Sequence, residues 1–199
     1  MKIVTIGEDG EVVIIVRERR GKGRRKAKIT VHPNLIKQME IRAESVFRPD
    51  SEDVETAYAL SGQDILDTLH KFTSKEVIRS ATPFEIHTKT EAKIRQILEE
   101  SEVPPKIVVD IHTHPKGSAE LSDQDIATNR RAYDLFSKHF DEVYFGVHAV
   151  SEEMRLKRTP PKVEGNRIVW NSIRRRHEVA FFDKDGKPVS VEIFNNDEG

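Results

Sequence analysis

Apolar and polar positions along the chain alternate in patterns that predict a mixture of strands and amphipathic helices. Residues 11–16 (EVVIIV) and 28–31 (KITV) are β-branched runs on either side of a glycine-containing segment, which predicts a β-hairpin. Residues 34–47 repeat apolar side chains every three or four positions, as one face of a helix does. The first part of the chain is therefore expected to form a hairpin followed by a helix.

The middle of the chain predicts strands separated by one helix. Residues 54–60 and 107–111 are short apolar runs typical of buried strands, and 107–111 (IVVDI) is the clearest of them. Residues 65–72 favour another strand, with a short helix as the alternative, and residues 90–100 have a helical pattern. Residues 74–89 carry no clear pattern.

The last part combines a helix, strands and one charged stretch. Residues 122–140 predict an amphipathic helix and residues 142–150 a strand. The charged residues 151–176 are interpreted as an insertion outside the core, and residues 179–182 and 189–194 as a terminal hairpin. Because strands and helices do not alternate regularly, the pattern favours an α+β fold over a doubly wound sheet.

Composition limits the functions that the chain can have. Its 199 residues suit one main domain, and no apolar run reaches the roughly 18 residues of a membrane span. The absence of cysteine excludes disulfides, thiolate zinc sites and a cysteine nucleophile, so any metal must bind His, Asp or Glu. We expect a cytoplasmic protein without membrane contact; the sequence does not predict its oligomeric state.

The near-neutral net charge of −1 hides a basic cluster at residues 17–28, which hold eight Lys or Arg and one Glu. A solvated loop is the favoured interpretation. The alternatives are contact with a nucleic-acid backbone or with an acidic partner protein, and the lack of aromatic residues argues against base stacking.

The residues that point to chemistry follow the strand 107–111. His112 and His114 are two residues apart, so in an extended chain their side chains lie on the same side. Asp125 falls in the first turn of the next helix, where its carboxylate can complete a set of three ligands. Two histidines and one carboxylate leave a fourth position for water, as in a catalytic zinc site.

Each of these residues also has a structural interpretation. His-X-His pairs arise by chance, and Ser122 with Asp125 matches a helix capping box. Glu55 is the one acid in the apolar run 54–60, and a buried carboxylate without a partner is unfavourable. It could instead face solvent on an edge strand, which is the commoner position of a strand Glu. The occurrence of all these features in one chain favours the metal site.

Taken together, Glu55, the sequence His112-Thr113-His114-Pro115 and the pair Ser122 and Asp125 resemble the JAMM signature of the MPN-domain metalloproteases. The resemblance covers about residues 29–150 and 177–194, with Leu121 where many members have proline. It implies an α+β fold with an MPN (cytidine-deaminase-like) core, that is, a mixed, curved sheet flanked by helices. Residues 29–199 would form the catalytic domain and residues 1–28 a β-hairpin extension with the basic loop.

The resemblance also implies an activity. His112, His114 and Asp125 would bind one zinc ion per chain. Glu55 would take a proton from the zinc-bound water and deliver it to the leaving amine, and Ser122 would hydrogen-bond the developing oxyanion. The expected substrate is the isopeptide or peptide bond at the C-terminal glycine of a ubiquitin-like modifier, a small β-grasp protein, or its conjugates. The protein would then be a deubiquitinase-like metallo-isopeptidase.

Three rival functions remain open from the sequence. The run from Asp110 to His114 also resembles the first strand of metal-dependent phosphoesterase and amidohydrolase barrels, but such barrels need about 250 residues and only 85 follow His114. His139, His148 and His177 could supply further ligands for this rival, but His148 and His139 are interpreted as ordinary strand and helix-end residues. A nucleic-acid-binding module acting through residues 17–28 is the second rival. A catalytically silent MPN scaffold is the third, disfavoured because every catalytic position is filled.

Overall fold

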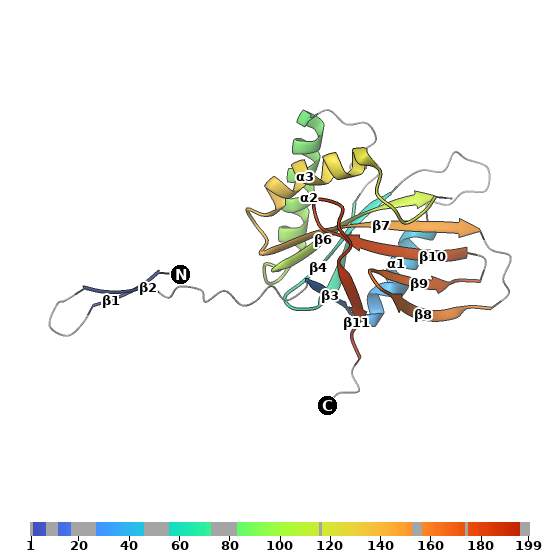
Figure 1. The fold of residues 1–199 in the computed structure, drawn as a ribbon, viewed down its shortest axis with the longest axis horizontal. Helices are drawn as coiled ribbons and strands as arrows, with labels where there is room; N and C mark the ends of the chain where they lie inside the picture. The colour runs from blue at the N-terminus through green and yellow to red at the C-terminus, as the bar shows by residue number, and fades with distance from the viewer. Residues whose placement is uncertain are drawn as a thin grey trace.

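A computed structural model describes residues 2–6, 12–16, 27–45, 56–72, 83–115, 117–152, 157–173 and 175–195. The main body consists of β3 (Lys28–Val31), α1 (Pro33–Glu44), β4 (Ala57–Gly62), β5 (Leu66–Lys71), α2 (Pro83–Glu100), β6 (Ile107–Pro115), α3 (Asp123–Phe136), β7 (Glu142–Glu152), β8 (Thr159–Glu164), β9 (Arg167–Asn171), β10 (Arg175–Phe182) and β11 (Ser190–Ile193) (Figure 1). Within this part of the chain, no helix is both long and apolar enough to cross a membrane.

One sheet of nine strands, in the order β11-β3-β5-β4-β6-β7-β10-β9-β8, organises the fold. The pairs β11–β3, β3–β5 and β6–β7 are parallel and the others antiparallel, so the sheet is mixed. Its two ends approach each other, because the amide of Val191 in β11 donates to the carbonyl of Gly165 between β8 and β9 at 3.3 Å. The predicted α+β fold with a curved mixed sheet and flanking helices is confirmed.

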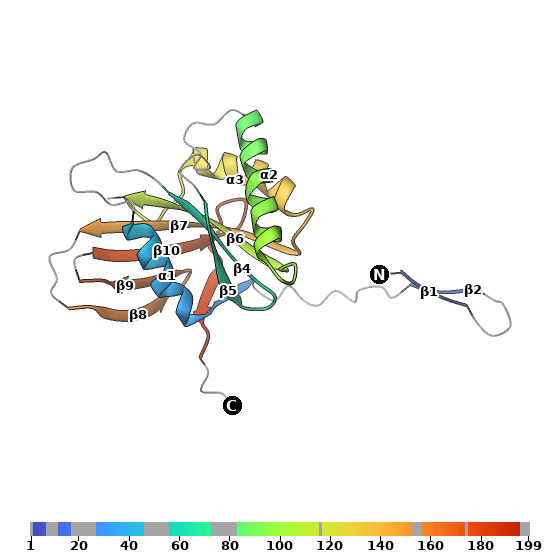
Figure 2. The same cartoon turned by 180° about the vertical axis from the view of Figure 1, so that it is seen from behind.

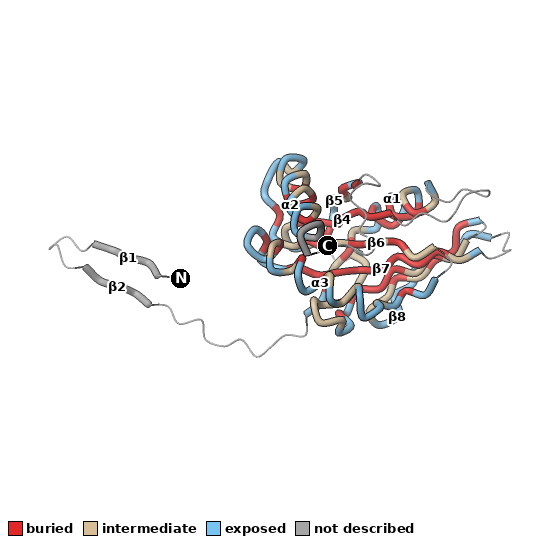
Figure 3. The backbone as a smooth tube through the Cα atoms, turned by 90° about the horizontal axis from the view of Figure 1, so that it is seen from above, coloured by how far each residue is buried: buried red, intermediate tan, exposed pale blue. Residues whose placement is uncertain are grey.

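α1 packs on one face of this sheet and α2 with α3 on the other, and Figure 2 shows α1 well apart from the other two helices. Strand β4 illustrates the cause, because successive side chains of a strand point to opposite faces. Tyr58 and Leu60 join the cluster under α1, whereas Ala57 and Ala59 join the cluster under α2 and α3. Figure 3 shows the buried backbone running through the central strands. Each large apolar side chain buried there contributes about 1.5–3 kcal/mol relative to leaving it exposed.

Several predicted elements are found with shifted ends. The helix at 34–47 is α1, and residues 46 and 47 lie outside the described part. The run 65–72 is a strand, β5, and the helix at 90–100 is the second half of α2. The strand at 107–111 continues through Pro115, so the His112–His114 pair lies within a strand. The helix at 122–140 ends at Phe136, after which short turns lead to β7.

The predicted hairpin of residues 11–16 with 28–31 is wrong. Strand β2 (Val12–Val16) pairs with β1 (Lys2–Ile6), and β3 pairs with β11 and β5 in the large sheet. Five residues separate β1 from β2 and eleven separate β2 from β3, and pairing strands that are closer in sequence costs less conformational entropy. The assignment of residues 1–28 as an extension remains a prediction, and the basic residues 17–26 lie outside the described residues.

The interpretation of residues 151–176 as lying outside the core is also wrong. They contain β8 and β9, and they lead into β10, three strands of the main sheet. Ile168 and Trp170 are buried in the core under α1, while the residues that precede each of them, Arg167 and Val169, are partly exposed. The alternation of a two-faced strand was present in the sequence, but the charged residues around it obscured the pattern.

The predicted terminal hairpin forms only at its turn. Residues 183–186 make the turn, with Gly186 at φ +77°, and the amide of Val189 returns to the carbonyl of Phe181. The chain then crosses to the far end of the sheet, where β11 pairs in parallel with β3. Val191 is thereby buried in the core under α1, a gain that pairing with β10 does not offer, because β7 and β9 already flank β10.

Candidate metal centre

Strand β6 directs its polar side chains toward α2 and α3. Ile111 belongs to the core cluster under α1, so its neighbours Asp110 and His112 point to the opposite face, together with His114. β6 is paired on both sides, with β4 and β7, which holds this part of the backbone in place. The His112–His114 pair thus projects from a rigid central strand.

The first turn of α3 holds the third side chain. Ser122 is the N-cap, and its hydroxyl accepts the amide of Asp125 at 3.1 Å. The Asp125 Oδ2 atom accepts both the Ser122 amide at 2.8 Å and the Ser122 hydroxyl at 2.7 Å. The predicted capping box is therefore present, and it occupies Oδ2 while Oδ1 lies toward the histidines.

Three ligand atoms converge at this point. The Nε2 atoms of His112 and His114 are 3.0 Å apart, and His112 Nε2 lies 3.4 Å from Asp125 Oδ1. Each of the three residues offers a ligand atom within 4.8 Å of the others. Ligand atoms at about 2.0–2.1 Å from a tetrahedral zinc ion are about 3.3 Å from one another. The donor set and its spacing therefore fit such an ion.

Local interactions orient the His114 imidazole and disfavour the charged form of His112. The Nδ1 atom of His114 lies 3.0 Å from the carbonyl of Ser118, an acceptor, so Nδ1 carries the proton and the Nε2 lone pair points toward the cluster. A Cβ atom on Gly117 would lie 3.0 Å from the Cβ of His114, so glycine allows this close loop. Burial lowers the pKa of His112 to about 4, although Asp125 opposes the shift.

Two supporting interactions escaped sequence reasoning. Lys93 of α2 donates to both carboxylate oxygens of Asp110 at 2.8 Å, a buried ion pair on the same face of β6 as the histidines. Thr113 donates its amide to the Thr56 carbonyl at 2.9 Å, and its Oγ1 accepts the Thr56 amide at 2.8 Å. Asp110, the acid within the apolar run IVVDI, was a sequence signal for the ion pair with Lys93. The sequence held no signal for the hydrogen bonds between Thr56 and Thr113.

The other predicted residues are placed as follows. Ser122 adjoins the three ligands through Asp125, as described above. Glu55 lies outside the described residues, so its role remains a prediction. Of the basic cluster 17–28 only Ala27 and Lys28 are described, and Lys28 forms an ion pair with Glu192.

The remaining histidines do not contribute to the cluster. His139 is exposed, whereas His148 and His177 are buried beside Trp170, which belongs to the core under α1. They form a chain of hydrogen bonds: Tyr58 Oη to His148 Nδ1 at 2.9 Å, His148 Nε2 to His177 Nδ1 at 3.1 Å, and His177 Nε2 to Glu44 Oε1 at 3.2 Å. Burial lowers the pKa of both His148 and His177. With one proton on each neutral ring, every bond in this chain has a donor and an acceptor.

No protein-family model matches the sequence, and no curated protein matches it either. Among solved structures, the fold is similar to the crystal structure of a JAB1/MPN domain protein from Archaeoglobus fulgidus, with 17% sequence identity and a TM-score of 0.43. The matched region covers 84% of this chain and 98% of that one. The functional argument therefore depends on the residues and geometry of this chain.

Proposed function

We propose that this protein is a zinc-dependent hydrolase of the JAMM type that cleaves the isopeptide or peptide bond at the C-terminal glycine of a ubiquitin-like modifier. The observation that carries the proposal is the convergence of His112, His114 and Asp125 from two separate elements, β6 and α3. The resemblance of the surrounding residues to the JAMM signature supplies the reaction and the substrate class.

The three residues would hold one zinc ion through two imidazole nitrogens and one carboxylate oxygen. A zinc ion in such a site supplies Lewis-acid chemistry and makes water acidic enough to lose a proton near neutral pH. The capping box contributes by orienting Asp125, because both hydrogen bonds to Oδ2 come from Ser122 and leave Oδ1 available.

The chain's own residues would manage the protons and the developing charge. Glu55 directly precedes Thr56, whose hydrogen bonds to Thr113 fix the backbone next to the histidine pair. We assign Glu55 as the group that accepts a proton from water and passes it to the leaving amine. Ser122 would donate to the oxyanion, which requires its hydroxyl proton to turn away from Asp125 Oδ2.

The partner in this proposal is a small β-grasp modifier or its lysine conjugate. The basic residues 17–28 would favour the encounter with an acidic protein surface, because complementary charge speeds association.

The test combines metal analysis with cleavage of a modifier–lysine conjugate. Glu55→Gln is expected to keep one zinc per chain and to lose cleavage, whereas Glu164→Gln, a matched change at an exposed strand end, should alter neither. Full cleavage by Glu55→Gln would refute the assigned base. Hydrolysis of p-nitrophenyl phosphate by the metal-loaded protein, unchanged by Glu55→Gln, would favour the phosphoesterase instead.

A further inference from the structure

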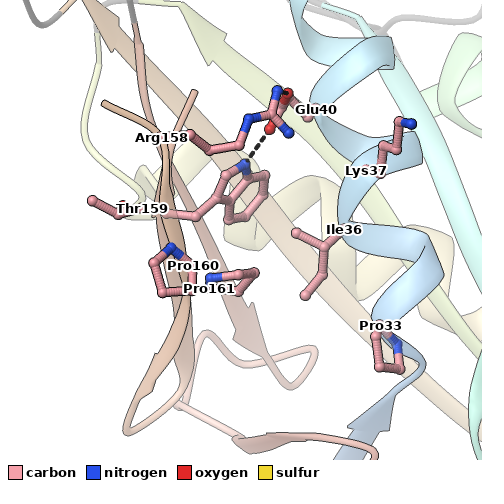
Figure 4. Close-up of a pocket in the computed structure, with 9 residues that line it drawn as sticks. Pro33, Ile36, Lys37, Glu40, Arg158, Thr159, Pro160 and Pro161 are labelled. Atoms are coloured by element: carbon pink, nitrogen blue, oxygen red, sulfur yellow. Dashed lines mark hydrogen bonds and ion pairs between the residues drawn. The ribbon is translucent and has the colours of Figure 1, made fainter. Parts of the chain in front are cut away.

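A groove of about 420 Å³ lies between the first half of α1 and the start of β8, an edge strand (Figure 4). Its walls are apolar: Pro33 and Ile36 come from α1, and Pro160 and Pro161 come from β8. α1 covers the opposite sheet face from α2 and α3, so this groove is separate from the metal centre. Its volume falls in the range of sites that bind small molecules.

Buried polar groups form the inner end of the groove. The indole of Trp170 is 2% exposed and donates its N–H to Glu40 Oε2 at 2.9 Å. Glu40 is 6% exposed, and its Oε1 accepts Arg158 Nη2 at 2.6 Å. Both oxygens of this buried carboxylate are therefore occupied, and its charge is compensated within the protein.

The groove also carries a positive charge that Glu40 does not neutralise. Lys37 lines it and is exposed, and in the described part of the chain it has no ion-pair partner. The side chain of Arg158 is 56% exposed, and a guanidinium has five N–H donors, so its bond to Glu40 leaves donors facing solvent. Cations at the rim of an apolar groove suit a ligand that has a hydrocarbon part and an anionic end.

We propose that this groove binds a small apolar carboxylic acid in its ionised form. The hydrocarbon part lies between Ile36 and the two prolines of β8, and the carboxylate meets Lys37 and Arg158. We expect the ligand to be bound by side chains and not as an extra strand paired with the edge strand β8. Pro160 and Pro161 lack the N–H groups that such pairing would need. This assignment does not depend on the metal site or on the proposed hydrolase activity.

Trp170 provides the assay. It is the one tryptophan of the chain, it lines the groove, and its ring stacks on His177 at 5.0 Å. We would titrate the protein with N-acetyl-leucine and, as a neutral isostere, with N-acetyl-leucinamide, following tryptophan fluorescence and heat of binding. The acid is expected to give a saturable change and to bind about tenfold more tightly than the amide, because hydrogen bonds to a charged group are the stronger ones.

A pair of matched variants tests the role of charge. Lys37→Gln should weaken binding of the acid about threefold, as loss of an exposed ion pair does, and Lys106→Gln, at an exposed position that does not line the groove, should leave it unchanged. Pro161→Asp adds an anion to the wall and should weaken binding further. All three sites are exposed, so the variants are expected to fold.

Several results would overturn this assignment. They are the absence of a saturable signal, equal binding of acid and amide, or equal affinities for Lys37→Gln and Lys106→Gln. A blocked peptide with a carboxyl-terminal leucine serves as a further competitor. If that peptide binds ten times more tightly than the free amino acid derivative, the occupant is a chain end and the small-acid assignment is wrong.

Discussion

Lowering the pH from about 7.5 to about 5.5 is expected to reduce the free energy of unfolding of the metal-free protein by about 3–4 kcal/mol. The cause is the partial burial of His112 and the burial of His148 and His177, which lowers the pKa of each in the folded state. In the unfolded chain the same rings have a pKa of about 6.5. Below that value the unfolded state binds protons that the folded state does not bind, so stability falls as the pH falls.

The magnitude follows from the titration of each ring. At one pH unit below its unfolded pKa, a histidine that stays neutral in the folded state lowers stability by about 1.4 kcal/mol. His112, with a folded pKa of about 4, and His148, whose pKa is lowered well below its usual value, therefore account for about 3 kcal/mol. His177 adds a smaller amount, because Glu44 beside it favours the charged form.

Urea unfolding at both pH values, with a chelator present, measures this difference. His148→Gln should reduce the pH-dependent loss by about 1 kcal/mol, because that titration disappears, while His139→Gln, at an exposed site, should leave the loss unchanged. A wild-type difference below about 1 kcal/mol would refute the reasoning, because at least one of the buried rings would then be charged in the folded protein.

Three further substitutions give distinct outcomes. Asp125→Ala should lose most of the bound zinc in metal analysis and should destabilise the apo protein by about 1 kcal/mol through loss of the capping box. Asp110→Asn should lower the urea-unfolding free energy by about 3–5 kcal/mol, because it leaves Lys93 buried without its carboxylate; a loss below about 1 kcal/mol would contradict the buried ion pair. Ile168→Ala should lower the free energy of unfolding by about 2–5 kcal/mol, and Val163→Ala on the exposed strand β8 should lower it by less than about 0.5 kcal/mol. Equal effects of the two substitutions would contradict the placement of β9 in the core.

The sequence predicted local elements well and long-range pairing poorly, for a physical reason. Periodicity reports which face of an element is buried, and it identified α1, β5, β6 and β7. It carries no information about which strand lies next to which. The partner of β11 was therefore misassigned to its neighbour in sequence, although Val191 is buried only through pairing with β3. The same limit applies to β2, which pairs with β1.

The candidate site was predictable where its residues are close in the chain. His112, His114 and Asp125 lie within fourteen positions of one another, and strand alternation with a helix cap is enough to bring them together. The ion pair of Lys93 with Asp110 joins two elements and therefore needed the tertiary structure. The groove beneath α1 was missed for the same reason, because its β8 wall comes from the charged stretch 151–176.

The pairing of β11 with β3 has a consequence for how the protein is made. The hydrogen bond from Thr30 to Glu192 joins residues 162 positions apart, and contacts of such long sequence separation slow folding. During synthesis, β6 and α3 emerge from the ribosome before β7 to β11, so the three candidate metal ligands are present on a nascent chain whose sheet still lacks these strands. A zinc ion captured at that stage would join β6 to α3 early and give the growing polypeptide a folded nucleus before its last strand is added.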